Sequence, residues 1–116
     1  MIERGDIYYA DFAPVPGAGE GGLRPVLIVE SYVGEKNSPT VIAVEITSEI
    51  PQTLLSTQIK IDASESGLSN DSVILLERIR TVDKRRVKEK IGHLDKQIMQ
   101  NVDTAISEDF GLGRKE

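Results

Sequence analysis

The thiol and imidazole side chains that serve in nucleophilic, acid–base and metal chemistry are scarce in this sequence. Its 116 residues include no cysteine and one histidine, His93, which excludes a disulfide framework, a thiolate metal site and a pair of catalytic imidazoles within one chain. Arginine and threonine side chains, Arg24 and Thr47 among them, could also hold a phosphate group. The guanidinium of Arg24 offers a rigid fork of donors, and the Thr47 hydroxyl can bond the same oxygens. A solvated loop arginine and a β-branched residue that ends a strand are the alternatives, which the residues alone favour.

Charge is distributed unevenly along the chain. The net charge is −5, but residues 78–90 hold seven lysines and arginines against two acidic residues, a local charge of +5 that leaves −10 for the rest. Such asymmetry is compatible with a nucleic-acid site on an otherwise acidic surface. A solvated, ion-paired helix face explains the same residues equally well, so charge does not decide between them.

The first two thirds of the chain have the pattern of short strands separated by turns. The run 25–29 is apolar on both faces and should form a buried central strand. Long loops are predicted at 13–23, which holds two prolines and four glycines, at 47–56 and at 62–71. β-Branched, aromatic and alternating runs predict the strands 7–12, 25–29, 40–46, 57–61 and 72–76, with a short final strand at 79–81.

The last third of the chain has the pattern of helices. Asp83 is a suitable N-cap for a first helix that ends near Ile91, before Gly92. Asp95 caps a second helix, with Leu94 and Met99 spaced for a hydrophobic staple. We interpret His93, between the two, as a structural residue, and we expect no metal and no cofactor. The second helix carries one apolar stripe, made of Ile98, Val102, Ala105 and Ile106.

Short strands followed by helices favour the α+β class, in the form of a small, mainly β, strongly bent sheet or open barrel with C-terminal helices. We expect one domain over residues 1–110 and a C-terminal tail over 111–116. The first residues contain no apolar segment typical of a signal peptide, and no apolar run approaches the ~18 residues of a membrane span. We therefore expect a cytoplasmic protein without membrane contact.

Four short motifs together resemble those of the MazF/PemK toxins. They occur in the family's order and spacing, the resemblance runs from about residue 2 to residue 106, and it is strongest to members from Gram-positive bacteria. The motifs are Arg-Gly-Asp-Ile-Tyr at 4–8, Gly-Gly-Leu-Arg-Pro-Val at 21–26, Ile-Thr at 46–47, and Asp-Ser-Val-Ile-Leu-Leu-Glu at 71–77 followed by Ile-Arg-Thr at 79–81.

The resemblance implies an SH3-like open barrel, a two-fold homodimer and the toxin of a type II toxin–antitoxin pair. It implies metal-independent, sequence-specific cleavage of single-stranded mRNA, which leaves 2′,3′-cyclic phosphate and 5′-hydroxyl ends. It also implies a cognate MazE-like antitoxin that blocks the RNA groove.

The resemblance assigns roles to residues that match the family's motifs. Arg24 and Thr47 match the catalytic arginine and threonine. Because an arginine with a pKa above ~12 stays protonated, we expect Arg24 to stabilise the charged transition state, with or without proton donation to the leaving oxygen, rather than to act as a base.

Further positions match residues that face RNA in the family. Gly21 and Gly22 would let the backbone approach RNA, although a turn explains them at least as well. Glu77 and Arg78 match RNA-facing positions, but close relatives usually carry glutamine where this chain has Arg78. The recognised RNA sequence therefore cannot be transferred.

Two other functions are compatible with the same fold. A gyrase-poisoning toxin that binds protein is one, but such relatives end in an aromatic segment with tryptophan, and this chain has none. A non-catalytic RNA-binding module is the other. Five aromatic residues could stack on bases or belong to the core or an interface: Tyr8, Tyr9, Phe12, Tyr32 and Phe110.

Overall fold

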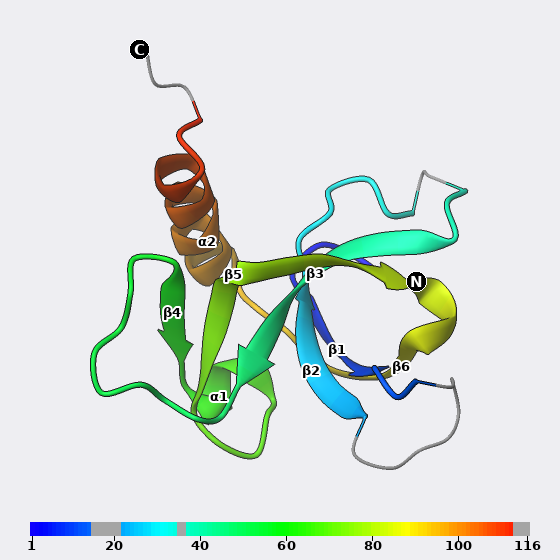
Figure 1. The fold of residues 1–116 in the computed structure, drawn as a ribbon, viewed down its shortest axis with the longest axis horizontal. Helices are drawn as coiled ribbons and strands as arrows, with labels where there is room; N and C mark the ends of the chain where they lie inside the picture. Colours follow the sequence, from blue (N-terminus) through cyan, green and yellow to red (C-terminus); the bar gives the residue numbers. More distant parts are fainter. Residues whose placement is uncertain (15–21, 35–36, 113–116) are drawn as a thin grey trace.

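Six antiparallel strands form one open sheet in the order β4-β5-β3-β2-β1-β6 (Figure 1). The computed structural model describes residues 1–14, 22–34 and 37–112, so Gly21 and most of the predicted tail lie outside it. The strands are β1 Asp6–Asp11, β2 Leu23–Ile28, β3 Thr40–Thr47, β4 Gln58–Ile61, β5 Ser72–Asp83 and β6 Val87–His93, with helices α1 Ala63–Ser66 and α2 Lys96–Asp109 and a 3-10 turn at Lys84–Arg86.

A bulge bends β5 in its middle. Val44 of β3 pairs with Ile79, whereas the next residue, Glu45, pairs with Leu75, so residues 76–78 have no partner in β3. Figure 1 shows β5 running beside β4 and then turning across the molecule. A bulge of this kind increases the local twist of a sheet. The predicted mainly β, strongly bent open sheet is therefore confirmed.

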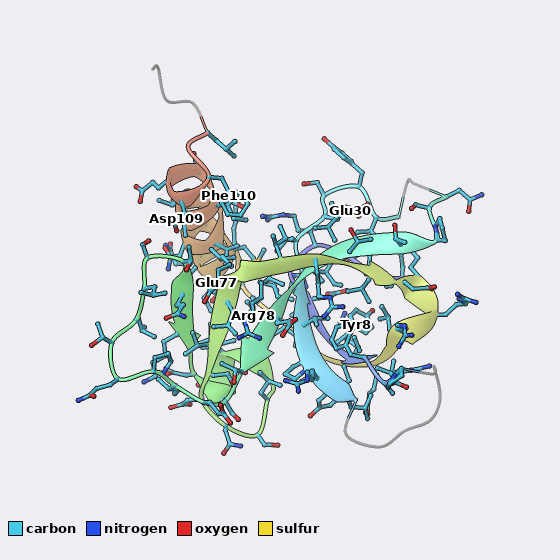
Figure 2. All side chains as sticks on the ribbon, viewed as in Figure 1. Tyr8, Glu30, Glu77, Arg78, Asp109 and Phe110 are labelled. Atoms are coloured by element: carbon cyan, nitrogen blue, oxygen red, sulfur yellow. The ribbon has the colours of Figure 1, made fainter. Side chains whose placement is uncertain are left out.

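The bend gives the sheet a buried cluster on each face. Neighbouring residues of a strand point to opposite faces, and the pairs Ile7/Tyr8 and Val26/Leu27 accordingly divide between the two clusters. Figure 2 shows Tyr8 inside the curl of the sheet. This arrangement explains the prediction of a strand apolar on both faces, because Val26, Leu27 and Ile28 of β2 are all fully buried.

Helix α2 covers one of the two clusters, as its apolar stripe predicts. Asp95 is its N-cap, with a side-chain oxygen that accepts a hydrogen bond from the Ile98 backbone N–H at 2.9 Å. Leu94, Met99 and Val102 are buried against Ile7, Leu27 and Ile74 of the sheet, and Ala105 and Ile106 pack at the edge of the cluster. No helix in the described part of the chain is long and apolar enough to cross a membrane.

The predicted helix over 83–91 is wrong. The described C-terminal region therefore contains one helix, α2, where the sequence predicted more than one. Asp83 does accept a hydrogen bond from the Arg85 backbone N–H, but it caps only the 3-10 turn Lys84–Arg86. The chain then forms β6, because pairing with β1 satisfies its backbone along a whole strand. Gly92 permits a close approach to α1 rather than ending a helix, since a Cβ there would lie 2.2 Å from the Ser66 carbonyl oxygen.

Two smaller boundaries also differ from the prediction. Residues 79–81 belong to the second half of β5 rather than to a separate strand, because pairing with β3 resumes after the bulge. The 62–71 loop contains the short helix α1, which Asp62 and Glu65 close with a reciprocal capping box.

The buried carboxylate of Asp6 joins the start of β1 to the edge strand β6. It accepts hydrogen bonds from His93 Nδ1 at 2.7 Å and from the Glu3 backbone N–H at 2.9 Å, and it lies 3.3 Å from Lys90 Nζ. Burial is the largest single influence and acts to raise the pKa of Asp6, but these hydrogen bonds and the charge of Lys90 together outweigh it and lower the pKa. His93 therefore has a structural partner and lies at the end of a strand, not between two helices.

We expect Asp6→Asn to lower the free energy of unfolding by roughly 1–3 kcal/mol at neutral pH, the range for an impaired buried hydrogen-bond network. Because the folded pKa of Asp6 is lowered, its stabilisation is complete above the unfolded pKa of about 3.9 and is lost as pH falls through the folded value. Denaturant unfolding at a series of acid pH values should show that the difference in unfolding free energy between Asp6→Asn and wild type becomes smaller as the pH falls. Glu89→Gln, which changes an exposed carboxylate, is the control. A difference in unfolding free energy between Asp6→Asn and wild type that did not change with pH would contradict this account.

Candidate functional site

The register between β2 and β3 brings Arg24 and Thr47 together. Val26 lies opposite Glu45 in the last pair between the two strands, and Arg24 and Thr47 each lie two residues beyond that pair. Both residues line a hollow of about 380 Å³, which we call the first hollow. Its remaining wall includes Tyr9 of β1 and polar residues after α1 and β3, among them Ser48, Ser69 and Asn70. Two residues far apart in sequence thus share one site.

A second hollow of about 260 Å³ adjoins the first and shares Arg24 and Thr47 with it. Its other polar residues include Glu45, Gln58, Glu77 and Arg78. Figure 2 shows Glu77 and Arg78 side by side at the bend of β5. The structure therefore brings four of the six predicted site residues, Arg24, Thr47, Glu77 and Arg78, around two contiguous hollows.

Arg24 and Thr47 are available to a ligand in different ways. The Arg24 side chain is exposed, and within the described residues it makes no hydrogen bond or ion pair. The Thr47 oxygen accepts a hydrogen bond from the Glu49 backbone N–H at 3.1 Å. Because a hydroxyl has one donor and two lone pairs, this bond holds the oxygen in place and leaves its proton free to be donated.

Glu77 is held as a carboxylate. It accepts hydrogen bonds from Thr57 Oγ1 at 3.0 Å and Gln58 Nε2 at 2.8 Å. Burial is the largest single influence and acts to raise the pKa of Glu77, but hydrogen bonds from Gln58, its own backbone and Thr57, with the nearby charge of Arg78, lower it overall. Glu77 is therefore ionised at neutral pH, where it can accept hydrogen bonds but has no proton to donate.

The two predicted glycines lie differently from the four other residues. Gly22 is buried, and a Cβ there would lie 2.6 Å from both the Ala13 backbone nitrogen and an Asp11 carboxylate oxygen. Its carbonyl accepts a hydrogen bond from the Phe12 N–H at 2.8 Å. Gly22 thus packs the base of the β1–β2 connection and lines neither hollow, while Gly21 is outside the described residues.

Among the lining residues, Tyr9 was named from the sequence only as one of five aromatic residues, and Ser69 and Asn70 were not named at all. Tyr9 has a detectable signal, because strand alternation separates it from the buried Tyr8 and directs it to the opposite face. Ser69 and Asn70 have none, since only the fold brings the segment after α1 beside Arg24. Of the other aromatics, Tyr32 and Phe110 are exposed. The described residues contain no cluster of three or more histidine, cysteine, aspartate or glutamate side chains that could hold a metal ion.

A strongly bent antiparallel sheet, one C-terminal helix, and an arginine and a threonine around one hollow define a small, mainly β domain with a candidate anion-binding site. Residues 3–110 match the family described as PemK-like, MazF-like toxin of type II toxin-antitoxin system, and the chain belongs to that family. The family predicted from the four sequence motifs is confirmed.

Known relatives resemble the chain over almost its full length. It is 46% identical over 112 residues to Endoribonuclease EndoA of Bacillus subtilis (strain 168), covering 97% of each chain. Among solved structures, it is similar to an endoribonuclease in complex with its cognate antitoxin from Mycobacterial species, with a TM-score of 0.77, 22% identity, and coverage of 99% of this chain and 100% of that one. It also resembles a MazE-MazF structure from Deinococcus radiodurans, with a TM-score of 0.75, 18% identity and 97% coverage of each chain. At these identities the structural likeness shows the fold.

Proposed function

We propose that this protein is the toxin of a type II toxin–antitoxin pair, a cytoplasmic endoribonuclease that cleaves single-stranded RNA without a metal ion. The observation that carries the proposal is the β2–β3 register, which places the Arg24 guanidinium and the Thr47 hydroxyl in one hollow. Membership of the toxin family and the similarity to EndoA support it.

The proposed reaction is an attack by the RNA's own 2′-hydroxyl. The 2′-hydroxyl gives up its proton to solvent as its oxygen bonds to phosphorus. The bond from phosphorus to the 5′-oxygen breaks and that oxygen takes up a proton from solvent, so the products are a 2′,3′-cyclic phosphate and a 5′-hydroxyl. Negative charge accumulates on the non-bridging oxygens in the transition state. Donors placed in advance, such as Arg24 and the free proton of Thr47, stabilise such charge. Because Glu77 is ionised, it does not serve as the general acid.

The residues around the second hollow bind the RNA next to the cut. The Glu77 carboxylate accepts hydrogen bonds from amino or imino groups of a base, and the exposed Arg78 guanidinium contacts phosphate or a base edge. Gly22 acts through packing, which positions the strand that carries Arg24. Gly21 is the remaining residue that we propose to bind RNA. RNA selectivity thus lies mainly in the second hollow.

Cleavage should continue in excess EDTA, because a guanidinium and a hydroxyl supply the charge stabilisation. The downstream fragment should accept a phosphate from polynucleotide kinase without prior dephosphorylation, since it begins with a 5′-hydroxyl. Loss of cleavage in EDTA with recovery in magnesium would overturn the metal-independent mechanism. RNA binding without cleavage would favour the non-catalytic module, and inhibition of gyrase supercoiling would favour the gyrase-poisoning alternative.

Arg24→Ala should lower kcat for RNA cleavage by roughly 10²–10³, the usual effect of removing one donor to a charged transition state. Thr47→Ala should be slower than wild type by a smaller factor, because a hydroxyl contributes less than a charged fork. Lys60→Ala, which removes one exposed positive charge on β4, is the matched control and should cut normally. A folded Arg24→Ala protein with near wild-type kcat would show that the assignment is wrong.

The toxin should be a homodimer that binds one RNA strand or one antitoxin tail at a time. A two-fold interface repeats the same surface on both protomers, whereas an RNA strand has polarity and cannot follow that symmetry. A MazE-like tail with carboxylates near Arg24 should compete with RNA for the hollows. Its affinity should depend moderately on salt, because the toxin is acidic overall, while RNA affinity should fall more steeply through counterion release.

Light scattering will give the mass in solution, and titrations at several salt concentrations will give the two affinities. The prediction fails if the protein is monomeric or if RNA and antitoxin peptide bind together without competition.

A further inference from the structure

A third hollow of about 340 Å³ lies against the turn after β1 and the second half of β5. Phe12, Pro14, Arg80 and Arg86 are among its lining residues. It shares no residue with the first two hollows, and nothing in the proposed cleavage mechanism uses it.

Arg80 and Phe12 form a stacked pair in this hollow. The guanidinium carbon of Arg80 lies 4.2 Å from the centroid of the Phe12 ring, a distance typical of cation–π contacts. Phe12 packs beneath it against the cluster that contains Tyr8 and Val26. The Arg80 side chain is 45% exposed, so the pair presents a flat, positively charged surface to solvent.

Hydrogen bonds fix the backbone that carries Phe12, beneath the Arg80 guanidinium. Arg86 Nη1 donates hydrogen bonds to the carbonyl oxygens of Asp11 at 2.8 Å and Ala13 at 2.6 Å, on either side of Phe12. Opposite Arg80 in the sheet lies Ala43, a small and fully buried residue, which leaves space above that face for the guanidinium. The stacked surface is therefore a built feature rather than a loose surface contact.

A shared ion pair connects the third hollow to the second. One carboxylate oxygen of Glu45 lies 3.7 Å from Arg78 Nη1, and the other lies 3.2 Å from Arg80 Nη1. Glu45 is only 16% exposed, against 61% for Arg78 and 45% for Arg80. The two guanidinium groups are therefore the more exposed members of this ion-pair network, and residues 78 and 80 lie two positions apart in β5.

We propose that the third hollow binds a further nucleotide of the same RNA strand, beyond the residues at the cut bond. Its base stacks on the Arg80 guanidinium above Phe12, and the remaining Arg80 donors contact the adjoining phosphate. Unpaired bases stack on arginine planes as well as on aromatic rings, with little dependence on base identity. The track thus runs from Arg24 past Arg78 to Arg80, and this inference rests on the proposed function.

The test compares binding of a short and a long single-stranded RNA. The short one spans the mapped cut bond and its immediate neighbours, the long one extends on both sides, and a 2′-deoxy sugar at the cut blocks cleavage. Arg80→Lys keeps the charge but removes the plane, and Phe12→Leu keeps an apolar side chain but removes the ring. Arg85→Lys is the matched control, because Arg85 is 83% exposed and does not itself line the hollow, and a lysine there keeps the positive charge beside its partner Asp83.

The affinity advantage of the long RNA is the Kd of the short RNA divided by the Kd of the long one. We expect this ratio to fall about tenfold or more in Arg80→Lys, within the range for one stacked base, and to fall also in Phe12→Leu. Arg85→Lys should retain the wild-type advantage. An abasic site at one flanking position should abolish the difference between wild type and Arg80→Lys, which identifies the stacked base. Thermal unfolding will verify that each variant is folded.

Three results would overturn the inference: an unchanged advantage in Arg80→Lys, equal losses for short and long RNA, or an equal loss in Arg85→Lys. A wild-type protein that binds the long RNA through Arg80 but cuts no RNA would refute the proposed function and leave the third hollow in place. Wild-type cleavage with an unchanged advantage in Arg80→Lys would do the reverse.

Discussion

The pairing of β3 with its two neighbours is the constraint on which the rest of the structure depends. On one side its pairing with β2 ends at Glu45 opposite Val26, and Thr47 and Arg24, each two residues beyond this pair, line the same hollows. On the other side, the break in register between Val44 and Glu45 bends β5 around the buried cluster that contains Tyr8. The same bend leaves Glu77 and Arg78 beside the second hollow. A shift of either register by one residue would turn every side chain of the shifted strand to the other face, and the site would be lost.

An acidic chain that binds a polyanion needs its charges arranged locally. Glu45 and Glu77 are each held by neighbouring donors, Glu45 by two arginines and Glu77 by Thr57 and Gln58. The hollows then present the exposed guanidinium groups of Arg24 and Arg78 beside the exposed carboxylates of Glu49 and Glu77, although the net charge is −5. Nearby contacts outweigh the distant acidic surface because salt screens interactions beyond about 10 Å. The same arrangement suits an antitoxin with carboxylates.

Local sequence patterns correctly predicted the elements that depend mainly on their own residues. Helix α2 needed only its cap and stripe, and β2 needed only its apolar run. The segment 83–91 misled the prediction because its charges suit a solvated helix as well as an edge strand. Pairing with β1, the Arg86 contacts with the Asp11 and Ala13 carbonyls and the Asp6–His93 hydrogen bond decide for the strand. All three involve residues more than seventy positions away, beyond the reach of any local pattern.

The sequence by itself determined the class of fold, most strands, the capped final helix, the family, and the roles that the family's motifs suggest for Arg24 and Thr47. Only the tertiary structure decided that Glu77 is held as an anion, that Gly22 serves packing, and that Tyr9, Ser69 and Asn70 line the site. It alone placed Arg80 over Phe12. The reason is physical. Helix caps and alternating strands are properties of neighbouring residues, whereas a hollow is made where distant strands meet, and its contacts depend on a register that no short segment contains.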